Sequence, residues 1–347
     1  MIDFPFQRYA LLALASAALF GAAAPALKPI AGAMHPVLLA GLLYLGSFIG
    51  LFAVRSVRAH VGEARLQRKD LPALAGAIVA GGMLAPVLLV WGLSGLAASS
   101  ASLLLASEAV LTMLVAALFF REAVAGRVWV AALLVLGAAA LLAWSPGTRL
   151  LFSPHALAVL AACLLWALDN NLTARIALAD PFAIAMWKGL AAGAVNTVLG
   201  LALAPAAPAM SWAAALVVGA IGYGVSLVLY VLAQRHLGAA RTAAHFGTAP
   251  FFGAALAVLL LHEPLSATLL VGFGLTALGT WLAVSERHLH EHEHEPMEHE
   301  HRHAHDEHHQ HAHRGGEGPE PHSHAHRHAS LRHRHAHFPD LHHRHRH

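Results

Sequence analysis

The chain of 347 residues is 57% hydrophobic and 12% charged, and its formal net charge at pH 7 is +3. An ordinary soluble domain has about 25% charged residues, so this composition excludes that class and indicates transmembrane helices. The small net charge does not suggest a nucleic-acid partner. The single cysteine, Cys163, excludes an intramolecular disulfide.

Ten apolar stretches, each about 17–25 residues long, predict an all-α membrane protein. Many of these stretches are rich in alanine and glycine, and helices in lipid pack against one another through small residues of this kind. The ten expected spans are 9–27, 36–54, 71–93, 97–119, 126–145, 154–174, 182–204, 211–233, 240–261 and 265–285.

The positive charges between the spans predict the orientation of the chain. Positive residues concentrate in cytoplasmic loops, so we expect both termini in the cytoplasm and the protein in the cell inner membrane as a multi-pass protein. Only Lys28 and Arg149 flank the spans on the opposite side. The side of the termini has twelve basic residues: Arg8, Arg55, Arg58, Arg65, Arg68, Lys69, Arg121, Arg127, Arg175, Arg235, Arg241 and Arg287.

Two stretches 141 positions apart have the same order of features. Leu96–Glu122 and Leu237–Glu263 both run from small residues through an apolar stretch to a terminal glutamate. Since each half has an odd number of spans, five, the second half must lie upside down relative to the first. Inverted repeats of this kind are typical of secondary transporters with a site near the membrane midplane. We therefore divide the chain into a first repeat at 1–145, a second repeat at 146–286 and a histidine-rich tail at 287–347.

The two halves resemble a known family. Their fourth and ninth helices are rich in small residues and end in Glu122 and Glu263, and their fifth and tenth helices are glycine-rich. This pattern, over residues 8–285, resembles the EamA-type members of the drug/metabolite transporter superfamily. The resemblance implies a ten-helix carrier that moves small metabolites by alternating access. A departure is Glu108, whose counterpart in the second half is Ala249.

The spans carry none of the sequence signatures of an enzyme or of a pump driven by ATP. No nucleophile–base constellation and no helix-borne metal motif occurs within them, and no phosphate loop of the Walker type is present. We therefore expect neither an enzyme nor a pump driven by ATP.

Polar side chains within the spans are the candidate substrate-binding residues. A charge at the bilayer centre costs about 3 kcal/mol on insertion scales, so it usually faces a cavity or a partner. Glu108 could bind a cationic group or carry a proton, and His245 could do either. Asp169 and Lys188 also fit a structural interpretation in which they pair only with each other. The predicted substrate-binding set is Glu108, Asp169, Asn170, Asn171, Lys188, His245, Trp91 and Tyr230.

Aromatic residues and prolines in the spans have two interpretations each. Trp91 and Tyr230 could contact substrate or belong to the aromatic belts at the membrane interface. Pro86 and Pro250 could mark a hinge or binding site, as interrupted helices often do, or a static kink. Further aromatic candidates for substrate contact are Tyr44, Trp166, Trp187 and Tyr223.

The tail differs completely from the rest of the chain, because residues 287–347 contain 23 of the 29 histidines. No apolar periodicity supports a core there, so we expect disorder without metal. Imidazole is a common ligand of zinc, nickel and copper, and His-x-His spacing supplies several ligands together. We expect no required cofactor, but predict Zn²⁺, Ni²⁺ or Cu²⁺ ions at the tail. The predicted ligands are His288, His290, His292, His294, His299, His301, His303, His305, His322, His324, His326, His333, His335 and His337.

The sequence favours a secondary transporter of small metabolites whose tail binds metal and regulates it. One alternative is a divalent-metal exporter for nickel, cobalt or zinc, and another is a membrane metal sensor without transport. The expected partners are a small-molecule substrate, the lipid bilayer and divalent metal ions at the tail, with no nucleic acid, and a homodimer is left open. Against the exporter, the soft and imidazole ligands of the membrane part are scattered: His155, Cys163, His245 and His262.

Overall fold

The computed structural model describes residues 4–57, 64–120, 126–144, 152–204, 209–284, 289–294, 297–303, 322–328 and 331–336. Within these ranges, eight stretches are long and apolar enough to cross a membrane, and the shorter apolar helices Trp129–Ala143 and Ala267–Leu282 bring the number to ten. These ten stretches follow the ten predicted spans in order. The expected all-α membrane fold is therefore confirmed.

The first half forms its five spans from several shorter helical segments. Helices α1 (Phe4–Gly21) and α2 (Ala23–Ala31) make the first span, and α3 (Pro36–Val57) makes the second. The third, fourth and fifth spans comprise the short 3-10 helix η1 (Arg68–Asp70), α4 (Leu71–Ala77), the π-helix η2 (Ile78–Leu84), α5 (Ala85–Gly95), α6 (Ala98–Leu104), α7 (Ala106–Phe120) and α8 (Gly126–Ala143).

The second half repeats this order. Its spans comprise α9 (Pro154–Ile176), α10 (Pro181–Leu203), α11 (Ala209–Val218), the π-helix η3 (Gly219–Val225), α12 (Ser226–Phe246), α13 (Ala249–Leu261) and α14 (Ala267–Val284).

One connection between spans is helical. The sequence placed the connection between the eighth and ninth spans at residues 234–239; the observed spans Met210–Leu237 and Thr242–Leu261 divide close to it, but α12 continues as a helix through the connection to Phe246. That stretch contains no proline, and its alanine, leucine and arginine residues favour helix. The new helix begins instead at Ala249, where Pro250 occupies the first turn and fits there because its missing N–H is not needed.

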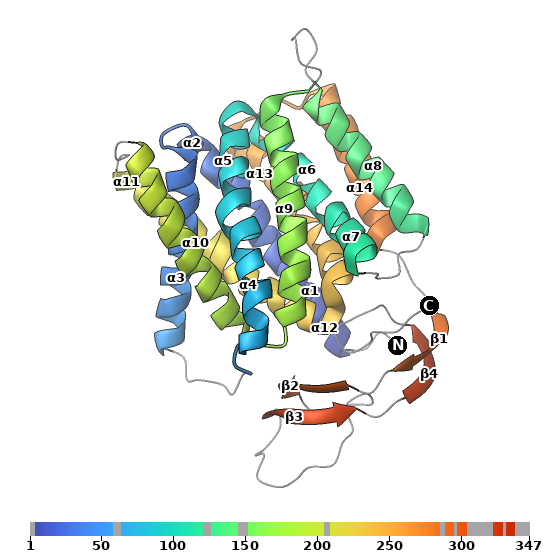
Figure 1. Ribbon diagram of the computed structural model, residues 1–347. Helices are drawn as coiled ribbons and strands as arrows, with labels where there is room; N and C mark the ends of the chain where they lie inside the picture. Colours follow the sequence, from blue (N-terminus) through green and yellow to red (C-terminus); the bar gives the residue numbers. More distant parts are fainter. Residues whose placement is uncertain are drawn as a thin grey trace.

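The two halves run in opposite directions and pack span against span. In Figure 1, α1 begins at the lower end of the bundle, whereas α9, the first helix of the second half, begins at the upper end. The main contacts pair α1 with α12, α3 with α10, α5 with α9, α6 with α13 and α8 with α14. An axis that exchanges the halves maps each of these pairs onto itself or onto another pair. The packing is that of an inverted repeat.

The irregular points of the backbone also follow the repeat. The π-helix η3 begins at Gly219, 141 positions after Ile78, where η2 begins. The fourth span breaks at Leu105, between α6 and α7, and the ninth breaks at Gly247, between α12 and α13. π-Helical turns are rare in proteins overall, but those that occur often lie at functional sites. The shared irregularities therefore indicate a candidate site in the middle of the bundle.

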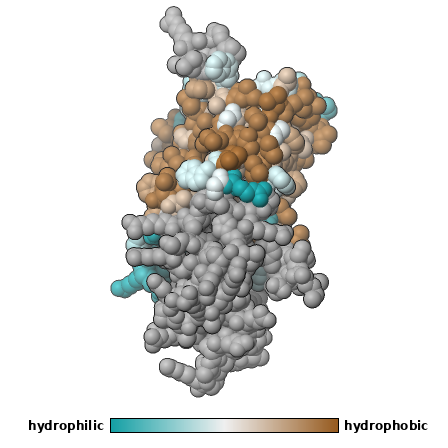
Figure 2. Space-filling model, turned by 90° about the vertical axis from the view of Figure 1, so that its right-hand side faces the viewer, coloured by the Kyte–Doolittle hydropathy of each residue, from teal (hydrophilic) through white to brown (hydrophobic). Residues whose placement is uncertain are grey.

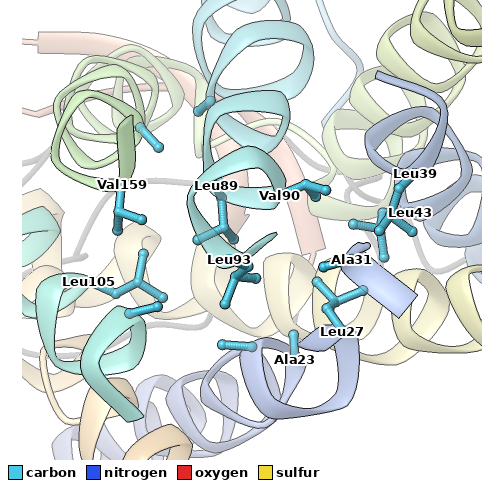
Figure 3. Packing of buried hydrophobic residues seen from close by; sticks show 14 of the residues in the cluster. Ala23, Leu27, Ala31, Leu39, Leu43, Leu89, Val90, Leu93, Leu105 and Val159 are labelled. Atoms are coloured by element: carbon cyan, nitrogen blue, oxygen red, sulfur yellow. The ribbon is translucent and has the colours of Figure 1, made fainter. Parts of the chain in front are cut away.

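A hydrophobic cluster closes the upper end of the bundle in Figure 1. Leu27 of α2, Leu43 of α3, Leu93 of α5 and Val159 of α9 belong to this cluster, and Figure 3 shows Leu93 between Val159 and Leu43 in that view. The outer surface is also apolar: Figure 2 shows a largely hydrophobic face over the bundle. Leu133 and Trp281, on the paired helices α8 and α14, are 73% and 60% exposed, which suits a hydrocarbon environment.

The described part of the tail contains four short strands, in contrast to the disorder that composition predicts. Strand β1 (Leu289–His294) pairs antiparallel with β4 (Leu331–Ala336), and β2 (Met297–His303) pairs antiparallel with β3 (His322–His328). The reason lies in the alternation of histidine with other residues, whose period of two matches a strand. The prediction of disorder for the rest of the tail concerns residues outside the described ranges.

Glycine at the interface of α3 and α10 gives a first testable prediction. A Cβ on Gly193 would lie 2.6 Å from the backbone N of Leu45, whereas a Cβ on Gly137 of α8 would meet nothing within 4 Å. Gly193→Ala should therefore lower the unfolding free energy by about 1–3 kcal/mol, because the helices must separate. Gly137→Ala is the control and should be neutral or stabilising by up to about 1 kcal/mol. Thermal unfolding of the purified protein measures both, and equal effects would contradict the prediction.

Candidate functional site

A central cavity lies between the two halves. The space between atoms there is about 450 Å³, including the part that is open to solvent, and α1, α3, α7, α9, α10, η3 and α12 all contribute to the wall. Of the eight predicted substrate-binding residues, the cavity wall includes Glu108, Asp169, Asn170, Lys188 and Tyr230.

The other three predicted residues lie off this wall. Asn171 is buried and donates its amide Nδ2 to the carbonyls of Thr112 (3.0 Å) and Ala167 (2.9 Å), so it joins α9 to α7. Trp91 is 42% exposed near the end of α5. His245 is half-buried in the last turn of α12.

The two charged residues Asp169 and Lys188 form a buried ion pair. Lys188 Nζ lies 2.6 Å from Asp169 Oδ1 and 2.8 Å from Oδ2, and Thr173 Oγ1 lies 3.4 Å away. The side chains of Lys188 and Asp169 are only 2% and 5% exposed. An ammonium group has three donors, and three oxygens surround this one. The pairing interpretation therefore holds, and both residues also belong to the cavity wall.

Glu108 differs from this pair in having no cation beside it. Its Oε1 accepts a hydrogen bond from Asn170 Nδ2 at 2.9 Å, and the same Nδ2 lies 3.3 Å from Thr112 Oγ1. Within the described residues, no lysine or arginine nitrogen comes within ion-pair distance of Glu108. Glu108 is 5% exposed and lines the cavity. With all three groups ionised, Glu108, Asp169 and Lys188 give the site a net charge of −1.

A carbonyl freed by the π-helix η2 positions two aromatic wall residues. In the π-helical register, the N–H of Ala85 donates to the carbonyl of Ala80. The carbonyl of Gly81 would need the N–H of residue 86, which is proline and has none. It accepts instead from Tyr44 Oη at 2.6 Å and from Trp166 Nε1 at 3.0 Å. Pro86 thus has a structural role that fixes part of the site.

Aromatic rings form a continuous section of the cavity wall. The ring centroids of Tyr223 and Phe20 are 5.6 Å apart, those of Phe20 and Phe246 are 5.2 Å apart, and those of Phe246 and Tyr230 are 4.9 Å apart. Tyr44 joins at 5.6 Å from Tyr223. The hydroxyl of Tyr223 is buried and has no hydrogen-bond partner among the described residues, whereas that of Tyr230 lies near the side chain of Gln234.

Sequence reasoning missed several wall residues. Phe20 and Phe246 were not singled out, because an apolar residue in an apolar span does not reveal which way it faces. A usable signal existed for Phe246, which directly precedes the break at Gly247. The other missed wall residues are Gly222, Ser226 and Leu227, which lie within or just after η3.

Known proteins resemble the chain over both halves. The model of the EamA-like transporter family matches residues 7–144 and 153–285. A protein of Methanothermobacter thermautotrophicus that bears the name uncharacterized transporter is 30% identical over 265 residues, which cover 71% of this chain and 77% of that protein. A solved crystal structure shares the fold with a TM-score of 0.61 and 20% identity, covering 80% of this chain and 95% of the other.

The buried ion pair yields a second prediction. Removing one partner leaves the other charge buried and alone, which costs about 3–5 kcal/mol, so Asp169→Asn and Lys188→Met should each destabilise strongly. The double variant should lose less than the sum of the two, because no lone charge remains. Thermal unfolding of the four proteins gives the coupling free energy, and strictly additive losses would show that the two charges do not stabilise each other.

Proposed function

The chain belongs to the EamA-like transporter family and is a membrane transporter, and we propose that it carries a small metabolite by alternating access. The single observation that supports the mechanism is a cavity bounded by both halves, with α1, α3 and α7 on one side and α9, α10, η3 and α12 on the other. A site between oppositely oriented halves can open to each face of the membrane in turn when one half rocks against the other. Proton or substrate gradients would drive the cycle.

Hydrogen bonds of two charged side chains would close one end of the cavity. At the end where α2, α5 and α6 meet, Lys28 Nζ donates to the carbonyls of Leu93 (2.8 Å) and Leu96 (2.5 Å). Glu263 Oε1 and Oε2 accept from the backbone N–H groups of Ala98 (2.7 Å) and Ser99 (2.8 Å), the first residues of α6. These contacts, together with the hydrophobic cluster, are candidates for breakage when the cavity opens there.

The position of Glu263 follows from how α13 ends. His262 adopts a left-handed conformation (φ 54°, ψ 35°), which turns the chain sharply after the helix. A carboxylate at a helix N-terminus satisfies otherwise unpaired N–H groups and interacts favourably with the helix dipole. Because the basic residues favour cytoplasmic termini, we assign this closed end to the outer face of an inner-membrane protein.

Removal of the Glu263 contact tests alternating access. In a Cys163→Ala background, Ser226→Cys places a thiol on the cavity wall. Adding Glu263→Ala should raise the labelling of this thiol from the outer face several-fold, measured with a membrane-impermeant thiol reagent on vesicles of known orientation. Asp70→Ala is the control, because among the described residues this carboxylate accepts from Gln67 within its own turn and lies off the cavity wall. Unchanged outer labelling, or equal labelling from both faces in every variant, would count against the mechanism.

We further propose that the tail binds Zn²⁺, Ni²⁺ or Cu²⁺ and regulates the transporter. The observation that favours this is the strand register, which sets histidine opposite histidine at several positions. Opposed residues of antiparallel strands have Cα atoms about 5 Å apart, and zinc sites commonly combine several imidazoles. The five histidine pairs are His290–His335, His292–His333, His299–His326, His301–His324 and His303–His322.

Substitution of one strand of these pairs tests the tail. His322→Gln, His324→Gln and His326→Gln together should lower the number of Zn²⁺ ions bound per chain, measured by calorimetric titration. The control replaces three histidines outside the tail, His35, His155 and His262, and should bind as the wild type does. If the control loses binding and the tail variant does not, the ions bind in the membrane part and the metal-exporter alternative is favoured. A protein that binds metal as expected but transports no solute would favour the alternative of a membrane metal sensor.

A further inference from the structure

We propose that the central cavity selects a small organic monocation, whose ammonium group binds between Glu108 and the aromatic section of the wall. This substrate class deepens the proposed function and rests on it where transport is concerned. Binding itself requires only the cavity. The charges, the rings and an unpartnered hydroxyl each support the same class of ligand.

The charges exclude most other classes. Lys188 is the one basic side chain on the described wall, and Asp169 and Thr173 surround its ammonium group. An anion would have to displace Asp169 from Lys188, and so would the carboxylate of a zwitterion. Among the described residues, the Glu108 carboxylate meanwhile accepts from the Asn170 amide and has no ion-pair partner. A buried charge without a counterion is unfavourable, and a ligand with a charge of +1 would neutralise this one.

The rings distinguish an organic cation from a bare metal ion. Tyr223, Phe20, Phe246 and Tyr230 follow one another along the wall that also contains Glu108. The faces of aromatic rings attract ammonium and quaternary ammonium groups, whereas hard divalent cations need several oxygen ligands. On the described cavity wall, no group of three or more His, Cys, Asp or Glu side chains could hold a metal ion.

An unpartnered hydroxyl supplies a further contact. Tyr223 and Tyr230 are 6% and 3% exposed and line the cavity; the Tyr230 hydroxyl lies near the Gln234 side chain, whereas the Tyr223 hydroxyl has no partner among the described residues. Buried polar atoms are usually hydrogen-bonded, so the orphaned hydroxyl of Tyr223, on the same wall as the Glu108 carboxylate, fits a ligand that brings donors. An ammonium group with two or three N–H bonds meets this requirement, because a hydroxyl oxygen and a carboxylate can both accept.

Three probes of equal size and different charge test the proposal. Benzylammonium, benzyl alcohol and benzoate share one ring, and their binding to the purified full-length protein can be measured by calorimetric titration. We expect benzylammonium to bind at least about tenfold more tightly than either of the others. Glu108→Gln should remove this preference. Tyr223→Leu should weaken the binding of benzylammonium more than it weakens the binding of benzoate. Asp70→Asn, which removes a carboxylate far from the wall, should bind as the wild type does.

The possible outcomes separate this proposal from the transport mechanism. Equal binding of the three probes to the wild type would overturn the cation site, and so would a Glu108→Gln protein that keeps the preference. If proteoliposomes exchange solutes from an isotope-labelled cell extract but benzylammonium does not inhibit the exchange, the cation site fails and the carrier stands. If benzylammonium binds with the expected preference but no solute is exchanged, the carrier fails and the cation site stands.

Discussion

In a bilayer, every backbone polar group needs a partner inside the protein, because lipid tails offer none. The carbonyl of Gly81 is the place where this requirement organises the site. Its helical donor is missing because residue 86 is proline, and Tyr44 and Trp166 replace that donor from two other helices. These two side chains are therefore held in fixed positions on the cavity wall. The irregular helix η2 and the cavity wall are therefore linked, because the carbonyl that the helix leaves without a donor is satisfied by two residues of the wall.

Buried charges also need partners inside the protein, and the charged residues of the cavity wall differ in whether they have a counterion. Asp169 and Lys188 satisfy each other, and Gly81 makes room for the pair, because a Cβ at that position would overlap Asp169 Oδ2. Glu108 has an amide partner but no counterion. A chain that keeps an unpaired carboxylate in such a place bears a cost in stability. That cost is understandable if a ligand or a proton shares the position during the transport cycle.

The sequence predicted the architecture well because span length and small-residue packing are properties of composition. It also predicted Glu108, Asp169, Asn170 and Lys188 on the wall, since polar groups in apolar spans have few other places to lie. It could not predict Phe20 or Phe246 there, because a helix that is apolar on all sides carries no sign of its inner face. Likewise, the paired strands of the tail depend on pairing between residues far apart in the sequence, which composition does not reveal.

The repeat is symmetric in its backbone and asymmetric in its chemistry. Both halves have a π-helix at the same register and a broken helix one span later, so both can supply equivalent hinges to a rocking motion. The ionisable groups of the cavity do not follow this symmetry, because Ala249 occupies the position equivalent to Glu108, while Asp169 and Lys188 both come from the second half. In the alternating access proposed above, symmetric hinges would let the cavity open in the same way to either face. An asymmetric wall would then let one orientation of the ligand be preferred in both states, because the binding groups would not change when the open end does.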